Sequence, residues 1–306
     1  MNINCSWCGG SGKFVYYMRH YPVYQCRHCG TGFVHPMPGT AELKELYNDF
    51  IPQLSIKSLD RMKNVTADLL SQIGVRKKRA GLRMLDIGGG GGFYCKAFEL
   101  MGYGSSVYVD LDPVSCRFAR KELGLKNVTQ ADALQWIAEA GGLFDFIHCR
   151  HVIEHMADPV GFCDALIKAI SPGGVLLLQL PNGDSLEYLA YWHLNVLNRL
   201  RNISDSNDFS RLRTLWYATN GRLLHGMDPP RHLWAVSRQG LRSWTYARML
   251  SGEIFTKHLG NRAFSLGFQS SSKILPRIRD MVGQHVLSRI NGGTHLVALI
   301  RKRVIS

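Results

Sequence analysis

Four of the eight cysteines in this 306-residue chain form two closely spaced pairs. Cys5 and Cys8 make the first pair, Cys26 and Cys29 make the second, and a glycine follows each pair directly. Each C-x-x-C turn can present two thiolates, so the two turns together offer the four sulfur ligands of a tetrahedral zinc site. Because four cysteines leave no open coordination position, the spacing predicts a structural zinc rather than a catalytic zinc or two disulfides.

A glycine-rich segment follows the apolar residues 83–87 and carries the second chemical signal. It begins at Asp86 and fits the pattern D-x-G-x-G-x-G through Gly88, Gly90 and Gly92. Glycines in such a turn let the backbone approach a ligand, and on their own they also suit a dinucleotide. A carboxylate two residues before the first glycine would repel a pyrophosphate but can accept hydrogen bonds from an ammonium group. The acid therefore favours a ligand with a methionine-like moiety.

Further acids follow the next two apolar segments. Asp110 ends the segment 106–110, about twenty residues beyond the glycines, where an acid suits a pair of ribose hydroxyls. Asp112 competes for that role. Asp132 and Ala133 follow the segment 127–130, where the carboxylate can accept from an adenine amino group and the backbone can contact the ring edge. The order of these acids along the chain predicts that the ligand with the methionine-like moiety also carries a nucleoside.

The elements that must position these residues alternate, from Arg83 onward, between apolar strands and amphipathic helices. We expect strands at 83–87, 106–110, 127–130, 144–149 and 174–180. This alternation is typical of an α/β fold with a doubly wound parallel sheet. Ligands of such sheets bind at the carboxyl ends of the strands, which is where the glycine turn lies.

The segment from about 80 to 182 resembles the class I S-adenosylmethionine-dependent methyltransferases. Besides the glycine turn and its acids, the likeness includes residues 144–159 (FDFIHCRHVIEHMADP) and residues 171–182 (SPGGVLLLQLPN). The resemblance implies a Rossmann-like, seven-stranded sheet, extended by strands near 253–258 and 295–301. It also implies S-adenosylmethionine as the cofactor, bound by Asp86, Gly88, Gly90, Gly92, Asp110, Asp112, Asp132, Ala133 and His151.

Proline and glycine breaks divide the chain into units. The break at 36–40 predicts a zinc ribbon at 1–36, a helical linker or cap at 37–79 and a methyltransferase domain at 80–306. We expect helices beginning at Thr40 and spanning about 59–73. An insertion at about 183–250 holds nine arginines and four tryptophans. It either covers an anionic substrate with guanidinium and aromatic groups or forms a helical cap whose arginines face water.

His232 follows a Pro-Pro-Arg segment, and an imidazole with a pKa near 6.5 suits a general base. A zinc ribbon ahead of this core is similar to the zinc-containing deoxysugar C-methyltransferases and their relatives in polysaccharide and natural-product pathways. That resemblance implies that His155 and His232 face the substrate and serve acid-base catalysis. Those enzymes carry an acid where this chain has Arg231, so methylation of oxygen and of carbon both stay open.

A second likeness concerns the same segment. Quinone-biosynthesis O-methyltransferases have an acid, two residues and then Glu-His here, and these residues bind a divalent metal. In this chain His151 stands in place of the acid, before Glu154 and His155. A cation held by these three side chains is the alternative to His151 near the cofactor and His155 near the substrate.

The formal net charge of +14 suits either an anionic partner or a merely basic, solvated surface. We expect a small-molecule acceptor, nucleotide- or phosphate-linked, for a methyltransferase that acts on oxygen or carbon in a saccharide or natural-product pathway. Two alternatives remain: an RNA methyltransferase, whose partner would be nucleic acid, and a non-catalytic zinc-ribbon scaffold that holds the cofactor only as a sensor or structural ligand.

Apolar runs such as Val175 to Leu178 are far shorter than the roughly 20 residues that span a bilayer, so we expect no membrane span. The first ten residues lack the basic start and apolar stretch of a secretory signal. We therefore expect a cytoplasmic protein with reduced cysteines.

Overall fold

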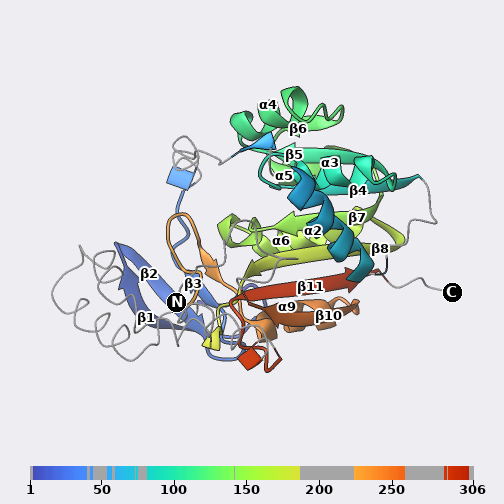
Figure 1. Cartoon of the computed structure of the whole chain (residues 1–306). Helices are drawn as coiled ribbons and strands as arrows, with labels where there is room; N and C mark the ends of the chain where they lie inside the picture. The colour runs from blue at the N-terminus through green and yellow to red at the C-terminus, as the bar shows by residue number, and fades with distance from the viewer. Residues whose placement is uncertain are drawn as a thin grey trace, which may run out of the picture.

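A computed structural model describes residues 3–39, 42–43, 54–56, 59–72, 74, 81–140, 142–186, 224–258, 286–287 and 289–302. These residues form two sheets, a small one built mainly from the N-terminal residues and a large one that carries the rest of the fold (Figure 1). The predicted helix at Thr40 and the insertion between 187 and 223 lie outside the described residues.

The large sheet has seven strands in the order β10-β11-β8-β7-β4-β5-β6. The strands from β8 to β6 run parallel, and β11 joins β8 antiparallel with β10 at the edge. Their bounds are β4 (Leu82–Ile87), β5 (Gly104–Asp110), β6 (Val128–Gln130), β7 (Phe144–Arg150), β8 (Ile170–Pro181), β10 (Ser251–Lys257) and β11 (His295–Arg301). The predicted Rossmann-like, seven-stranded α/β sheet is confirmed, including its two C-terminal strands.

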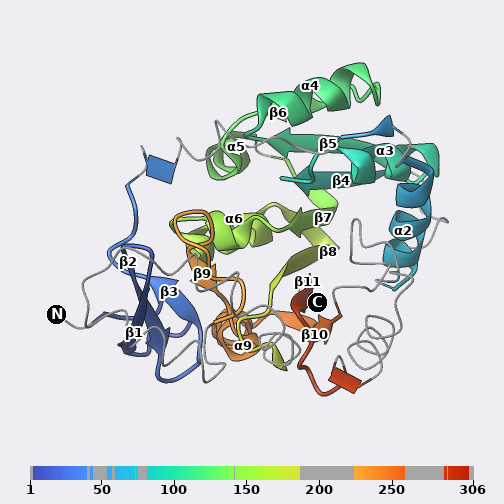
Figure 2. The same ribbon diagram turned by 60° about the vertical axis from the view of Figure 1, so that its left-hand side comes forward.

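Helices cover both faces of this sheet, which explains why most side chains of its central strands are buried. α2 (Leu59–Gln72), α3 (Phe93–Leu100) and α4 (Pro113–Lys121) share one buried cluster, while α5 (Ala133–Ala140), α6 (Pro159–Lys168) and α9 (Arg238–Ala247) contribute to the other. Figure 2 shows α2 and α3 on the opposite side of the strands from α6. The predicted helix at 59–73 corresponds to α2 over the described residues 59–72.

The small sheet consists of β1 (Gly12–Met18), β2 (Tyr21–Cys26), β3 (Gly32–Val34) and β9 (Trp234–Ala235), all antiparallel. Its fourth strand comes from a segment about 200 residues later in the chain, with Phe33 paired to Trp234. The N-terminal unit is therefore completed by a strand from the region that holds His232.

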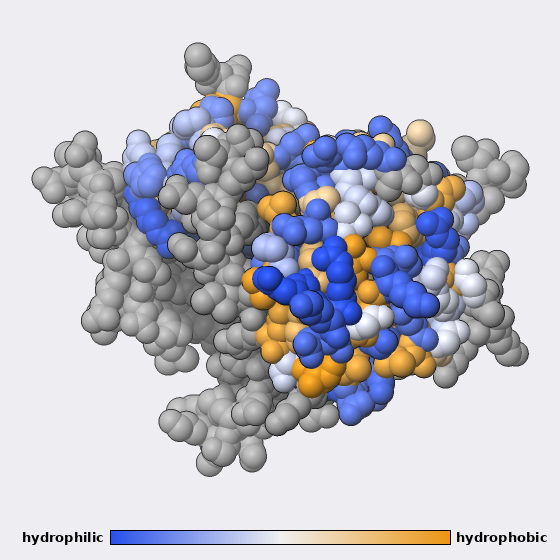
Figure 3. Space-filling model, turned by 90° about the horizontal axis from the view of Figure 1, so that it is seen from above, coloured by the Kyte–Doolittle hydropathy of each residue, from blue (hydrophilic) through white to orange (hydrophobic). Residues whose placement is uncertain are grey.

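The described surface is mixed in character. Seen from above, hydrophilic residues lie between hydrophobic ones (Figure 3). Val114, Arg117 and Arg120 of α4 are exposed. Within the described part of the chain, every helix is too short or too polar to cross a membrane.

Candidate active site

The glycine turn joins β4 to α3 at the carboxyl end of the sheet. Gly88, Gly90, Gly91 and Gly92 have φ angles of 62°, 60°, 103° and 79°, a region that favours glycine. No described atom lies within 4 Å of the position that a Cβ would take at Gly90. The turn can therefore bring its backbone against a ligand at this point, and Gly91, which the sequence pattern did not single out, contributes to it.

Asp86 is completely buried beneath this turn. Its Oδ1 lies 2.7 Å from Nδ1 of His148, and the ring of Tyr94 packs against His148 with centroids 4.1 Å apart. A Cβ on Gly89 would lie 2.1 Å from Oδ2 of Asp86, so only glycine lets the turn close over the carboxylate. Oδ2 has no hydrogen-bond partner among the described residues, which makes it the oxygen left for a ligand or water.

Asp110 is linked to the glycine turn through Tyr108. The Tyr108 hydroxyl donates to Oδ2 of Asp110 at 2.5 Å and accepts from the Gly91 amide at 2.9 Å. Burial raises the pKa of Asp110 above its ordinary value. Asp112, the predicted competitor, caps α4 by accepting from the amides of Val114 and Ser115. The structure thus places Asp110 directly beside the turn and gives Asp112 a helix-capping role.

Asp132 and Ala133 follow β6, at the same edge of the sheet. The backbone amide of Ala131 donates to the Asp110 carbonyl at 3.1 Å, which places this loop beside the end of β5. Asp132 is exposed and accepts from the Gln135 amide at 3.0 Å, while Ala133 is buried. Their part in binding an adenine stays a prediction.

The segment after β7 carries a second group of ionisable side chains. His151 has a φ of 52°, and its Nδ1 lies 3.0 Å from Oε1 of Glu154, which is completely buried. Burial opposes the ionisation of Glu154, but the hydrogen bond from His151 and the neighbouring imidazoles lower its pKa to about 2. Oε2 of Glu154 has no hydrogen-bond partner among the described residues. A buried carboxylate here is therefore negatively charged at neutral pH.

The structure brings the two predicted catalytic histidines together. The rings of His155 and His232 meet edge to face with centroids 4.7 Å apart. Nδ1 of His155 lies 2.8 Å from the Arg231 carbonyl, and Nδ1 of His232 lies 2.8 Å from the Gly226 carbonyl. Because a carbonyl only accepts, Nδ1 must carry the proton in both rings, and Nε2 is the basic nitrogen. Burial lowers the pKa of His232 to about 4, so its ring is neutral at pH 7.

The 3₁₀ helix η2 (Ile153–His155) holds this pair close to the glycine turn. A Cβ on Gly88 would lie 2.5 Å from Cγ2 of Val152, directly before η2. On the other side, the Leu233 amide donates to the Glu154 carbonyl at 2.7 Å. The glycine turn therefore adjoins the segment that leads into His155.

Ligand atoms of Glu154, His155 and His232 lie within 4.8 Å of one another, so the three side chains can also hold a metal ion. This group differs from the predicted set of His151, Glu154 and His155. His151 bonds to Glu154 through Nδ1, and His232 contributes the third ligand atom instead. The sequence could not show this replacement because His232 lies 78 positions after Glu154.

A family model described as a methyltransferase domain matches residues 59–247, which is more than half of the chain. The chain belongs to this methyltransferase-domain family. Ubiquinone biosynthesis O-methyltransferase of Xanthomonas oryzae pv. oryzae is 33% identical over 118 residues, covering 37% of this chain and 48% of the relative. The protein of that name from Ruegeria pomeroyi is 29% identical over 129 residues, covering 41% and 52%. The chain spans about half the length of these curated relatives.

Two solved structures are among those similar to this chain. A SAM-dependent methyltransferase from Archaeoglobus fulgidus has a TM-score of 0.47 and 15% identity, covering 79% of this chain and 94% of that one. The N-methyltransferase NodS from Bradyrhizobium japonicum WM9 has a TM-score of 0.44 and 14% identity, covering 86% and 97%.

A cluster of four cysteines lies in the N-terminal residues, outside the part of the chain that the methyltransferase-domain model matches. The Sγ atoms of Cys5 and Cys29 lie 3.7 Å apart, those of Cys8 and Cys26 lie 3.4 Å apart, and all four lie within 4.8 Å of one another. A tetrahedral zinc with Zn–S bonds of about 2.3 Å has S–S edges of about 3.8 Å. The glycines after the two pairs have φ angles of 74° and 78°, which turns the backbone beneath the sulfurs. The cluster therefore fits a zinc ion.

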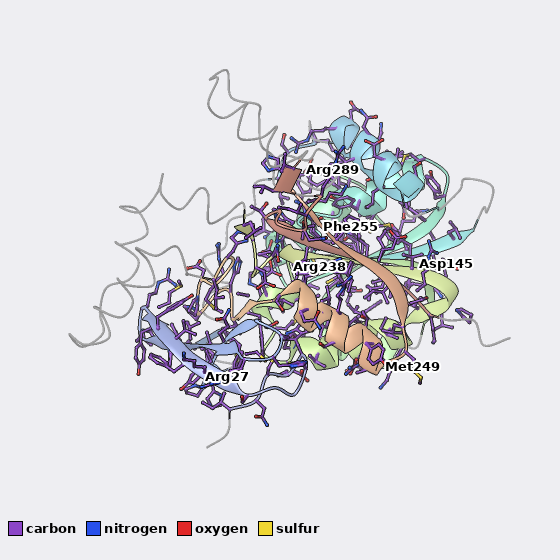
Figure 4. All side chains as sticks on the ribbon, turned by 90° about the horizontal axis from the view of Figure 1, so that it is seen from below. Arg27, Asp145, Arg238, Met249, Phe255 and Arg289 are labelled. Atoms are coloured by element: carbon purple, nitrogen blue, oxygen red, sulfur yellow. The ribbon has the colours of Figure 1, made fainter. Side chains whose placement is uncertain are left out.

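The described tryptophans of the insertion are buried in the methyltransferase domain. Trp234 donates from Nε1 to the Met156 carbonyl at 2.8 Å, and Trp244 donates to Asp164 at 2.9 Å. Arg238 lies at the start of α9 (Figure 4), and its Nε donates to the Ile254 carbonyl at 3.1 Å. These side chains pack the domain together. Arg231, by contrast, is 58% exposed beside the histidine pair, where it makes an ion pair with Asp228 at 3.4 Å.

Proposed function

We propose that this chain is an S-adenosylmethionine-dependent methyltransferase that acts on a small acceptor and uses His232 as its general base. The observation that carries the proposal is the closeness of two groups: the glycine turn with Asp86 and Asp110, and the histidine pair, whose His155 follows the Val152 segment that approaches Gly88. One group suits a nucleoside with an amino-acid moiety, and the other suits removal of a proton next to it.

The residues at the strand ends fit the cofactor. The free oxygen of Asp86 can accept from its ammonium group, Asp110 from its ribose hydroxyls and Asp132 from its adenine amino group. When bound, S-adenosylmethionine supplies a methyl group activated by the sulfonium. The open side of Gly90 leaves room for the backbone to lie along the ligand.

His232 would take the acceptor's proton at Nε2. The bond from Nδ1 to the Gly226 carbonyl fixes the ring orientation and would stabilise the imidazolium that forms. His155 lies against this ring and would orient the acceptor. Positioning of the nucleophile in line with the methyl group would supply most of the acceleration.

The acceptor is a small, anionic or sugar-like molecule from a saccharide or natural-product pathway, and zinc in the cysteine cluster stabilises the N-terminal unit. Exposed Arg231 and the net charge of +14 support an anionic group such as a phosphate. The curated relatives are named O-methyltransferases, which supports oxygen as the methylated atom. We place the protein in the cytoplasm, where the cysteines stay reduced.

Calorimetry with S-adenosylhomocysteine and transfer of labelled methyl to fractionated acceptor pools test this proposal. We expect His232→Ala to reduce turnover by about 10²- to 10⁴-fold while the cofactor dissociation constant stays unchanged. His20→Ala, at an exposed turn of the small sheet, is the matched control. Equal loss of turnover and cofactor affinity in His232→Ala, or loss of neither, would contradict the role of His232.

A second candidate is a cation-assisted methyltransferase, favoured by the cluster of Glu154, His155 and His232 and by the unpaired oxygen of Glu154. In that case these side chains would bind a divalent ion that orients the acceptor. Mn²⁺ binding, measured by electron paramagnetic resonance, distinguishes the cation-assisted candidate from the general-base candidate. Tight binding that Glu154→Gln abolishes, with turnover that depends on the ion, would favour the cation over the base.

A further inference from the structure

The segment that carries His232 is part of the N-terminal sheet. Immediately after His232, the Leu233 carbonyl accepts from the Val34 amide at 3.1 Å. Trp234 then pairs with Phe33, and their rings stack with centroids 5.7 Å apart. The strand that follows the proposed base is thus the edge strand of the cysteine-bearing unit.

Two buried hydroxyls join the end of this strand to the cysteine cluster. The Ser237 hydroxyl donates to the carbonyl of Cys29 at 2.5 Å, and the Ser237 amide donates to Oγ1 of Thr31 at 3.1 Å. Both side chains are completely buried. Because Cys29 is one of the four sulfur ligands, the position of the 233–237 segment depends directly on the geometry of the cluster.

The turn before His232 is also held by the N-terminal unit. Arg19, in the hairpin between β1 and β2, makes an ion pair with Asp228 at 3.0 Å and donates to the carbonyl of Pro229. The His232 amide in turn donates to the Asp228 carbonyl at 2.9 Å. His232 therefore lies between two attachments to the same unit, at 228–229 and at 233–237.

The glycine turn, unlike residues 228–237, is contacted by residues outside the N-terminal unit. The side chains nearest to the Cβ positions at Gly88, Gly91 and Gly92 come from 54, 93, 108, 118, 119, 125 and 152, all outside the N-terminal unit. The two halves of the site are consequently supported by different parts of the molecule.

We propose that the cysteine cluster controls catalysis by positioning His232. When a metal fills the four thiolates, the N-terminal sheet is folded and holds residues 228–237 from both ends, so that His232 meets His155. When the metal is removed, the short unit loses its folding energy and the base is displaced, while the cofactor turn stays formed. This inference rests on the proposed function of His232, and it makes Arg19 and Thr31 positioning residues.

Two variants that leave the cysteines intact test the inference. We expect Arg19→Ala and Thr31→Val each to lower kcat by about 10- to 100-fold, because a small misplacement of a catalytic group has effects of this size. Zinc content and the dissociation constant for S-adenosylhomocysteine should stay unchanged. Arg27→Ala, an exposed arginine of the same unit (Figure 4), is the matched control and should retain full turnover.

A readout without turnover separates this inference from the proposed function. The imidazole NMR signal of His232, assigned with His232→Gln, should shift on zinc removal and in both variants, but not in Arg27→Ala. Unchanged turnover in both variants, or a parallel loss of cofactor affinity after zinc removal, would overturn the inference. If the wild type transfers no methyl to any acceptor, the proposed function fails, and an unshifted His232 signal would then refute the positioning on its own.

Discussion

The chemistry expected of His232 follows from the partners of its ring. Nδ1 donates to the Gly226 carbonyl, which leaves Nε2 to accept a proton. Burial lowers the pKa of the imidazole to about 4, against an ordinary value near 6.5. A neutral base is therefore present across the physiological pH range.

The pH dependence of activity should reflect this shift. We expect the acid limb of kcat/KM to fall well below pH 6.5, towards about 4, because only neutral His232 can accept a proton. Since the unfolded chain binds more protons between pH 4 and 6.5, the free energy of unfolding should decrease as pH falls through that window and be unaffected by this group above it. A pH-rate profile and urea unfolding measure both effects; an acid limb near 6.5 would argue against His232 as the base.

Asp86 should determine cofactor affinity. We expect Asp86→Asn to weaken binding of S-adenosylhomocysteine by about 10- to 100-fold, because it removes a charged acceptor beneath the glycine turn. The control is Asp145→Asn. Asp145 lies at the start of β7, away from the glycine turn, and its carboxylate accepts from the Arg83 amide at 2.9 Å. Calorimetry compares the two variants, and similar affinities in both would contradict the role of Asp86.

At the scale of elements, β4 and β5 approach each other closely at their first residues, at the opposite ends of these strands from Asp86 and Asp110. Gly104 begins β5 with a φ of 155°, and a Cβ there would lie 1.9 Å from the Leu82 carbonyl oxygen. The contact is between backbones of paired strands, so no side-chain rotation can relieve it.

We therefore expect Gly104→Ala to lower the free energy of unfolding by more than about 2 kcal/mol. Gly102→Ala is the comparison, since its φ is 74° but no described atom lies within 4 Å of the added Cβ. The cost there should be limited to the left-handed backbone, about 1 kcal/mol. Urea unfolding measures the free energy of unfolding of both variants. Equal decreases in the two variants would contradict the backbone clash at Gly104.

At the scale of the molecule, the cysteine cluster joins the N-terminal residues to the methyltransferase domain. Trp7, between the first two cysteines, meets Trp244 of α9 with ring centroids 6.4 Å apart, and both are buried. The cysteine cluster thus lies beside the contact between the N-terminal residues and α9.

Purified protein should contain one zinc in this cluster. We expect Cys8→Ser to lose that zinc and to unfold at a lower temperature, because the metal supplies folding energy to the N-terminal unit. Cys95→Ala, a buried cysteine of α3 far from the cluster in sequence, should keep its zinc. Elemental analysis and thermal unfolding measure both, and full zinc retention in Cys8→Ser would exclude the four-cysteine site.

The sequence by itself determined the features that depend on neighbouring residues. The C-x-x-C turns, the glycine turn after Asp86 and the alternation of strands and helices are local, because a few residues fix their spacing and backbone conformation. The tertiary structure decided the rest. Asp86 meets His148 across 62 residues through the register of two strands, and a two-residue strand at 234–235 has no pattern that reveals its partner. Strand pairing is made by backbone groups common to all residues. Only the folded chain therefore shows that the N-terminal unit contacts the residues on both sides of His232.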